Sequence, residues 1–418
     1  MGLSRREMFA AAGGGLALTA TGAGAAAAAP GPGTGLTSIT TGATPIGRPE
    51  RLERLAKLRR LMKSAGVTAL IVESGSSLDY FTGVQWRRSE RTTAAVIPVD
   101  GEVVIVTPDF EAPSVKETLA VPGQVRVWEE HESPFAVIAN VLKTRRAGAG
   151  PVAAEDTTRL FIVEGVRQAA GVRVVSGGGL VRDCRMIKTP AELALMQTAN
   201  DVTIAALRHV RGKVQTGMTS ADIAAIMDAA SLDLGASQVE FSLVLLNEAS
   251  AFPHGSRQPQ SVREGSVILM DCGCSLHGYQ SDISRTFIHG EPSKRQREVW
   301  DLVRKGQALA LETARPGMPC GLVDDAVRAL YVKHGYGPGY KLPGLSHRTG
   351  HGIGMDGHEA PYLVHGDATA LKPGMCFSDE PGIYIPGEFG VRLEDCWHMT
   401  QSGPKLFTGL AASIDDPI

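Results

Sequence analysis

The chain has 418 residues, of which 43% are hydrophobic and 21% charged, and its formal net charge is −2. This length allows two or three domains with sizeable cores, and the composition is that of a soluble globular protein. The small net charge, with arginines spread along the chain, gives no reason to expect nucleic acid or an anionic membrane as a partner.

Residues 1–30 are predicted to be a twin-arginine signal peptide. The pair Arg5-Arg6 precedes a weakly apolar Gly/Ala-rich stretch that ends in small residues near Ala29, although Met8 stands where such signals more often have Phe. This pattern predicts a twin-arginine translocase as a transient partner and export to the periplasm or medium. The alternative is a disordered Ala-rich tail. The stretch has too many Gly and Ala for a membrane anchor, so none is expected in the mature protein. Residues 31–48 are predicted to be a flexible linker.

Residues 49–182 alternate helix and strand signals, which predicts a compact α/β domain. Leucines at a helical spacing fill residues 52–62 and stop before Gly66, and the buried strand pattern VTALIVES follows. The segment AAVIPVDGEVVIVT predicts a hairpin with its turn at Asp100-Gly101. Further strands are expected in PVAAEDTTRL and VRVVSGGGLV, and no nucleotide-binding loop is present.

Residues 189–405 are predicted to form a second domain. Thr189, Pro190 and Glu192 make a strong helix start, and the long helix ends near Lys213. Residues 215–235 and 315–335 then repeat one pattern: Gly-Met, a helix and a terminal Gly. The repeat predicts two related half-domains, with coincidence between two generic helices as the alternative.

Two acidic pairs lie in the apolar strands of this domain. A hairpin turning at residues 276–277 would place Asp271 opposite Asp282, and one turning at residues 386–388 would place Glu380 opposite Glu394. Directly opposed residues have Cβ atoms about 4.5–5.5 Å apart, and like charges there repel. Any one of these acids alone is more readily explained as a solvated or salt-bridged strand residue. Four in symmetric registers predict a site that holds cations.

A pair of divalent metal ions best satisfies four clustered carboxylates. Buried like charges cost several kcal/mol each without a cation, and carboxylates can bridge two ions about 3.5–4 Å apart. His351 lies between glycines in TGHGIGMDGHEAP and is a candidate fifth ligand. Such an oxygen-rich donor set without sulfur suits Mn²⁺, with Co²⁺, Fe²⁺ or Zn²⁺ as alternatives.

The cysteines give no sign of a further metal or redox centre. All six lie outside any C-x-x-C pair, so a zinc ribbon is not expected. They are predicted to be small buried hydrophobic residues, and disulfide formation is left open.

The order Asp, Asp, His, Glu, Glu, with FPHGS before it, GHGIGMDGHE within it and GVRLED at its end, resembles the pita-bread metallopeptidases of family M24. The chain is most similar to the Xaa-Pro peptidases, prolidase and aminopeptidase P, over about residues 50–405. The resemblance implies an α/β (α+β) chain with a creatinase-like N-terminal domain and a C-terminal pita-bread domain with a pseudo-twofold repeat.

The resemblance also implies roles for the ligands. Asp271 would bind one metal, His351 and Glu380 the other, and Asp282 and Glu394 would bridge the two. Glu380 would in addition move a proton as the bridging water becomes the nucleophile.

Four further residues match positions around the family's metal site. His254 and His358 match histidines that contact the scissile carbonyl and the substrate, and His347 matches one on the leaving side. Arg392 would share a strand face with Glu394 and orient an acidic ligand. For each residue taken alone, a structural role is an equally good explanation.

These features together predict an exported dimetal exopeptidase that hydrolyses Xaa-Pro bonds in short peptides and forms homodimers or larger homo-oligomers. The short chain favours a dipeptidase over an aminopeptidase. Tyr80, Trp86, Arg87 and Arg91 could reach a neighbouring subunit's site, or could equally be core aromatics and surface charge. An amidohydrolase related to ectoine hydrolase or creatinase, and a non-catalytic binding protein of the same fold, remain alternatives.

Overall fold

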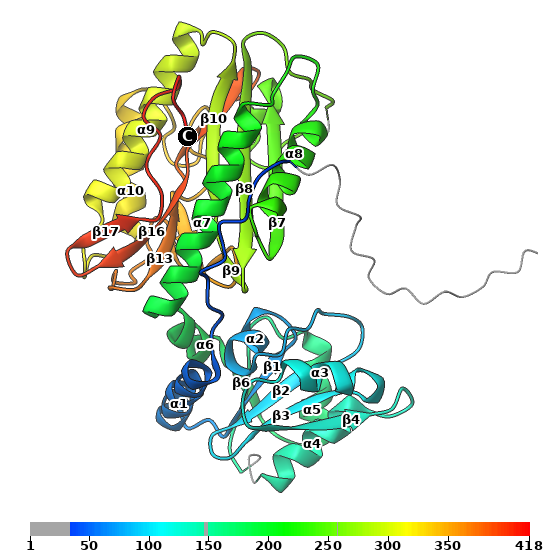
Figure 1. Ribbon diagram of the computed structural model, residues 1–418. Helices are drawn as coiled ribbons and strands as arrows, with labels where there is room; N and C mark the ends of the chain where they lie inside the picture. Colours follow the sequence, from blue (N-terminus) through cyan, green and yellow to red (C-terminus); the bar gives the residue numbers. More distant parts are fainter. Residues whose placement is uncertain (1–33, 146–148, 257) are drawn as a thin grey trace, which may run out of the picture.

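The computed structural model describes residues 34–145, 149–256 and 258–418, which form two α/β domains stacked end to end (Figure 1). The predicted signal peptide lies outside the described residues. Within them, no helix is both long and apolar enough to cross a membrane.

The first domain is built on one mixed sheet. Its strands run in the order β4-β3-β2-β1-β5-β6, with β2 antiparallel to both β1 and β3. The strands are β1 (Ala69–Glu73), β2 (Ala94–Pro98), β3 (Val103–Pro108), β4 (Gly123–Trp128), β5 (Val152–Ala154) and β6 (Val174–Ser176). The helices are α1 (Arg48–Ala65), α2 (Ser76–Thr82), α3 (Ala112–Thr118), α4 (Pro134–Thr144), α5 (Leu160–Ala170) and α6 (Gly178–Arg185).

Local sequence signals account for much of this domain. Leu55, Leu58 and Met62 form the buried stripe of α1, which ends at Gly66 with a φ of 66°. The predicted hairpin is β2–β3, and its register centres the turn on Asp100. The second half of VRVVSGGGLV is not a strand, because α6 begins at Gly178, directly after the short β6.

The segment before α1 is not a flexible linker in its described part. Residues 34–47 form an extended arm that lies against the second domain before the chain enters the first. Thr34 donates from Oγ1 to the Asp233 carboxylate at 2.6 Å, and the Ile39 amide donates to the carbonyl of Leu234 at 2.9 Å. Side-chain partners of this kind are not visible in local sequence composition.

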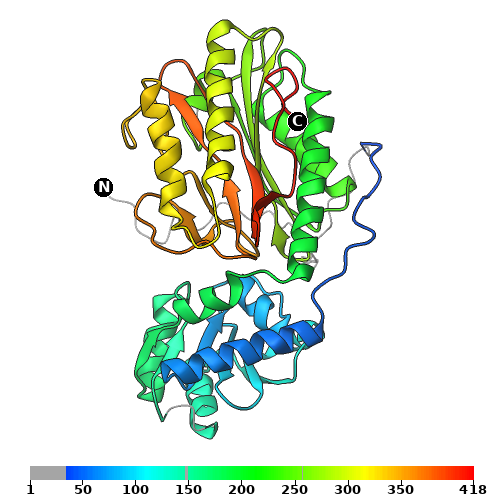
Figure 2. The same ribbon diagram turned by 90° about the vertical axis from the view of Figure 1, so that its left-hand side faces the viewer.

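The second domain has two helix pairs outside and strands inside (Figures 1 and 2). Helices α7 (Pro190–Arg211) and α8 (Ser220–Asp233) pack on β8 and β7, whereas α9 (Lys294–Thr313) and α10 (Gly321–Lys333) lie over the later strands. The strands of this domain are β7 (Gln238–Leu246), β8 (Ser266–Leu276), β9 (Tyr279–Gln280), β10 (Ile283–His289), β11 (Gly350–Gly352), β12 (Glu359–Leu363), β13 (Cys376–Asp379), β14 (Gly382–Ile385), β15 (Phe389–Arg392), β16 (Asp395–Thr400) and β17 (Gly403–Leu406). The predicted repeat therefore corresponds to α8 and α10.

The start of α7 also joins the two domains. Thr189 and Glu192 form the predicted capping box. The Glu192 carboxylate lies 3.3 Å from Arg54 of α1 and accepts a hydrogen bond from the hydroxyl of Tyr279 at 2.8 Å. The six cysteines are all buried and unpaired, as expected for small core residues.

Candidate metal centre

The first acidic hairpin has a different register from the one predicted. The turn residues between β8 and β9 are His277 and Gly278, with φ values of 48° and 86°. A two-residue turn with both φ values positive is of type I′, which favours Gly and disfavours Leu. The turn therefore lies one residue later, and Asp271 is opposite Ser284. The prediction that Asp271 directly opposes Asp282 is wrong.

The second acidic hairpin has the predicted register. Gly382 pairs with Arg392, and Asp379 pairs with Asp395. Glu380 and Glu394 lie between these pairs, so they face each other as expected. The turn centres on Gly387, whose φ of 80° again requires the conformational freedom of glycine.

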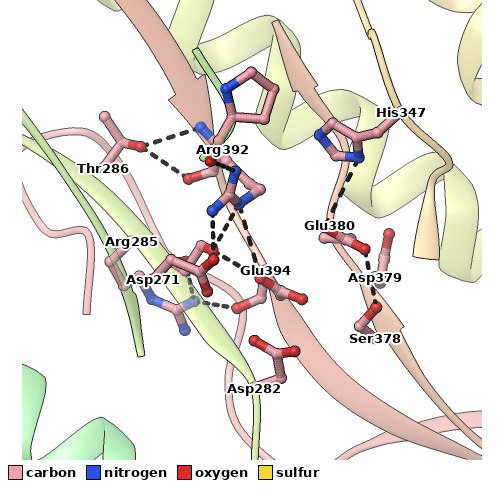
Figure 3. Close-up of polar contacts among 12 residues, drawn as sticks. Asp271, Asp282, Arg285, Thr286, His347, Ser378, Asp379, Glu380, Arg392 and Glu394 are labelled. Atoms are coloured by element: carbon pink, nitrogen blue, oxygen red, sulfur yellow. Dashed lines mark hydrogen bonds and ion pairs between the residues drawn. The ribbon is translucent and has the colours of Figure 1, made fainter. Parts of the chain in front are cut away.

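The two hairpins bring the four predicted carboxylate ligands into one cluster (Figure 3). Donor atoms lie within 4.8 Å of one another in Asp271–Asp282–Glu394 and in His351–Glu380–Glu394. A third such set joins Asp282 and His351 to His358. Donor atoms gathered at this spacing can be shared between cations.

The carboxylate oxygens of the cluster are short of protein partners. Asp271 Oδ1 and Glu394 Oε1 are buried without any hydrogen bond. Burial, reinforced by the neighbouring carboxylates, raises the pKa of Asp282 and of Glu394 well above the usual range. Carboxylates that lie close together and lack protein hydrogen-bond partners are typical of a cation-binding site. These residues therefore fit a metal.

His351 is oriented as a metal ligand. Its Nδ1 lies 3.0 Å from the Gly352 carbonyl, which requires the proton on Nδ1. Nε2 is then free of a proton and lies 3.5 Å from Asp282 and 3.4 Å from Glu380. Burial lowers the pKa of His351, which keeps the ring neutral. A backbone carbonyl that fixes the tautomer is a common support for metal-binding histidines.

Arg392 crosses from the second hairpin to the first. Its Nη2 lies 2.5 Å from Asp271 Oδ2, Nε donates to Ser284 Oγ at 2.9 Å, and Nη1 donates to the Tyr384 hydroxyl at 3.0 Å. The Glu394 carboxylate lies 3.9 Å from Arg392 Nε and accepts a hydrogen bond from Ser284 Oγ at 2.7 Å instead. Arg392 therefore orients one acidic cluster residue directly.

His347 belongs to a hydrogen-bond chain beside Glu380. Its Nδ1 donates to the Arg348 carbonyl at 2.8 Å, so Nε2 accepts from the Tyr384 hydroxyl at 2.7 Å. Burial, with the Arg392 charge, lowers the pKa of His347 to about 3. Sequence analysis missed Tyr384, although GIYIPG follows Glu380 within the same hairpin.

His358 is the exposed member of the histidine group. Its ring centroid lies 3.9 Å from that of His351. The Arg348 guanidinium lies 3.2 Å from His358 Nδ1. Arginine can only donate, so Nδ1 is the acceptor and Nε2 carries the proton, which suits a donor to a substrate oxygen better than a metal ligand. Partial desolvation of the ring lowers the pKa of His358 to about 4, with further lowering by His351 and Arg348. Sequence analysis missed Arg348, although it lies in the quoted motif LSHRTGH.

The cluster lies in a cavity of about 780 Å³. His254 also lines it, so all nine residues singled out in the second domain reach one cavity: His254, Asp271, Asp282, His347, His351, His358, Glu380, Arg392 and Glu394. By contrast, three of the four residues suggested for a neighbouring subunit contact their own domain. Tyr80 is buried against Arg54, Trp86 donates to Glu111 and Arg91 pairs with Glu130.

The chain is similar to two protein families and to known dipeptidases. The model of metallopeptidase family M24 matches residues 194–401, and that of the creatinase/prolidase N-terminal domain matches residues 54–187. The probable dipeptidase PepE of Mycobacterium tuberculosis is 33% identical over 359 residues, 84% of this chain and 92% of the relative. The Xaa-Pro dipeptidase of Lactobacillus helveticus is 32% identical over 85% of this chain and 96% of its own.

Solved structures agree with this assignment. The crystal structure of dipeptidase PepE from Mycobacterium ulcerans superposes with a TM-score of 0.79 at 30% identity, covering 88% of this chain and 97% of that one. The pita-bread domain with its creatinase-like N-terminal domain, expected from the sequence, is thereby confirmed. The chain belongs to metallopeptidase family M24.

Proposed function

We propose that the protein is a dimetal exopeptidase that hydrolyses Xaa-Pro bonds at the N-terminus of short peptides, with dipeptides as preferred substrates. One observation carries the proposal: orphaned carboxylates and a correctly oriented neutral histidine meet in a cavity large enough for a dipeptide. The prolidase-type activity of the similar Xaa-Pro dipeptidase supports the substrate class.

Asp271, Asp282, His351, Glu380 and Glu394 would hold the two cations. Divalent ions at such a site supply positive charge that polarises a carbonyl and lowers the pKa of water. Four carboxylates and one imidazole suit Mn²⁺, and none of the six cysteines is among the grouped ligand residues. Measuring bound metal and activity after reconstitution with Mn²⁺, Co²⁺, Fe²⁺ or Zn²⁺ would test the choice.

Two residues would handle protons and charge in this proposal. Glu380, whose carboxylate lies 3.4 Å from His351 Nε2, would take a proton from the attacking water and pass it to the departing proline nitrogen. His358 Nε2–H would donate a hydrogen bond to the scissile carbonyl as negative charge develops on its oxygen. His254, which is exposed in the same cavity, would assist in binding the substrate.

The first experiment compares Ala-Pro with Ala-Pro-Ala. The full chain, loaded with Mn²⁺, is assayed for release of alanine from both peptides. Cleavage of the dipeptide alone is the expected result and means a dipeptidase. Cleavage of the tripeptide means an aminopeptidase with an open far end. Cleavage of neither by protein with two bound metals overturns the proposal and favours amidohydrolase chemistry.

We further propose that the protein is exported by the twin-arginine route. The paired arginines Arg5 and Arg6 and the small residues near Ala29 support this proposal. A variant with both arginines changed to lysine should stay in the cytoplasm, whereas the unchanged chain should appear in the periplasm or medium. Equal distribution of the two forms on cell fractionation would refute export by this route.

A further inference from the structure

The cavity carries an acidic side chain that the metal cluster does not use. Along β7 the pairing with β8 passes from Val239–Cys274 to Phe241–Gly273, so Glu240 is an extra residue in a β-bulge. Bulges next to functional sites commonly re-aim a side chain. Glu240 lines the cavity together with Phe241 and Leu243.

The charge of Glu240 has no direct cationic partner. Its Oε2 accepts a hydrogen bond from Gln238 Nε2 at 3.2 Å, and it forms no ion pair within the described ranges. Gln238 accepts in turn from Arg87 Nη2 of the first domain at 3.4 Å. The Arg87 guanidinium therefore reaches Glu240 only through a neutral amide.

A second hydrogen-bond acceptor lies in the same cavity. Gln280 donates from Nε2 to the Met355 carbonyl at 3.1 Å, which directs its Oε1 elsewhere. Oε1 lies beside Gly357, where an added Cβ would be 3.0 Å away, and both residues line the cavity. Apolar Phe241 and Leu243 also line the cavity. A long apolar stem with a cationic end matches these groups.

Arg348 also lines the cavity, but it does not pair with Glu240. Arg348 lies 3.2 Å from His358 Nδ1 and stacks at 4.3 Å over the ring of Tyr362. Its guanidinium is thus held by two residues other than Glu240, and the carboxylate remains available to a ligand.

We propose that Glu240 is a specificity-determining residue that favours Xaa-Pro substrates whose first residue is arginine or lysine. This inference rests on the proposed function, because it concerns the side chain bound next to the scissile bond. A partly desolvated ion pair between the carboxylate and a guanidinium is expected to favour the charged substrate by about tenfold in kcat/KM.

The test compares Arg-Pro with citrulline-Pro, which has nearly the same shape without the charge. The full chain with Mn²⁺ is expected to prefer Arg-Pro about tenfold. Glu240→Gln should bring the ratio close to one, and Glu240→Lys should invert it. Glu248→Gln removes an equal charge from an exposed residue outside the cavity lining and should leave the ratio unchanged.

The possible failures are distinguishable. If Ala-Pro and citrulline-Pro are cleaved but the Arg-Pro preference is absent, or persists in Glu240→Gln, this inference is wrong and the proposed function stands. If Ala-Pro, citrulline-Pro and Arg-Pro are all resistant to the metal-loaded enzyme, the proposed function fails and the inference fails with it. Cleavage of Ala-Pro by each variant shows that the substituted protein is folded.

Discussion

Glu394 and Asp395 are neighbours in the chain, yet they belong to two contrasting buried sites. Both oxygens of Asp395 are satisfied by protein: Arg285 and Thr408 donate to Oδ1, and Gln307 donates to Oδ2 at 2.9 Å. Glu394, on the opposite face, has one oxygen without a partner and shares a cluster with Asp271 and Asp282. Burial with an unsatisfied oxygen does not by itself indicate a metal site, because both oxygens of Asp379 are also buried without a hydrogen bond. What distinguishes Glu394 is that its unsatisfied oxygen belongs to a group of donor atoms shared with Asp271 and Asp282.

Removing a carboxylate from the unsatisfied site should have the largest effect. Glu394→Gln is expected to lower kcat/KM for Ala-Pro by about 10³–10⁴-fold, since several kcal/mol of charge stabilisation are lost. Bound metal, measured by elemental analysis, should fall below two ions per chain. Glu388→Gln, in the exposed turn of the same hairpin, is the control. Two retained ions with full activity would contradict the ligand assignment.

Removing a partner from the satisfied site around Asp395 should lower the stability of the protein rather than its activity. Arg285 and Asp395 are both completely buried, and Arg285→Met leaves an uncompensated charge. The free energy of unfolding is expected to fall by about 3–5 kcal/mol in urea titration. The double variant Arg285→Met/Asp395→Leu should recover much of this loss. A fall below about 1 kcal/mol would show that Thr408 and Gln307 suffice for Asp395.

The stability of the metal-free protein should depend on pH because of the carboxylates in the unsatisfied site. The raised pKa values of Asp282 and Glu394 mean that the folded state keeps protons that the unfolded state releases. Stability should therefore fall as the pH rises from about 4 towards the raised pKa values, by about 1.4 kcal/mol per group and pH unit.

Calorimetry with chelator and with Mn²⁺ would measure this dependence. Mn²⁺ should remove or reverse the slope, because metal binding requires deprotonated carboxylates. Glu394→Gln should reduce the slope of the metal-free form. Identical slopes with and without metal would contradict a cation site at these residues.

The smallest effect is expected from removing Ser284, which donates a side-chain hydrogen bond to the Glu394 carboxylate. Ser284→Ala removes the hydrogen bond to Glu394 and the one accepted from Arg392. The free energy of unfolding should fall by about 1–2 kcal/mol in urea titration. Ser256→Ala, at an exposed position, provides the comparison. A loss as large as that of Arg285→Met would mean that both sites depend equally on protein partners.

The hairpins and the grouping of their four carboxylates were predictable because turn signals are local, whereas the two-domain fold was expected from the resemblance to the Xaa-Pro peptidases. The Pro386-Gly387 turn predicted the register of the second hairpin correctly. For the first hairpin, the preference of Gly278 for a positive φ displaced the turn by one residue. Moving a turn by one residue shifts the pairing by two, so every side chain keeps its face. Asp271 and Asp282 therefore still meet at the cluster, although they are not directly opposed.

The remaining features depend on contacts between distant segments. Ser284 supports the cluster through Glu394, 110 residues away, and Tyr384 donates to His347, 37 residues away. No periodicity or turn pattern in the sequence indicates either contact. The interaction of Thr34 with Asp233 likewise spans 199 residues and joins a segment without regular secondary structure to a helix end.

The arm formed by residues 34–47 has a consequence for the order of synthesis. Its partners at Asp233, Leu234 and Gly235 emerge from the ribosome long after the arm itself. Docking closes a loop of 199 residues, at an entropic cost that grows only slowly with length. The first described residues of the chain therefore reach their final place only after the first half of the polypeptide has been made and α8 has formed.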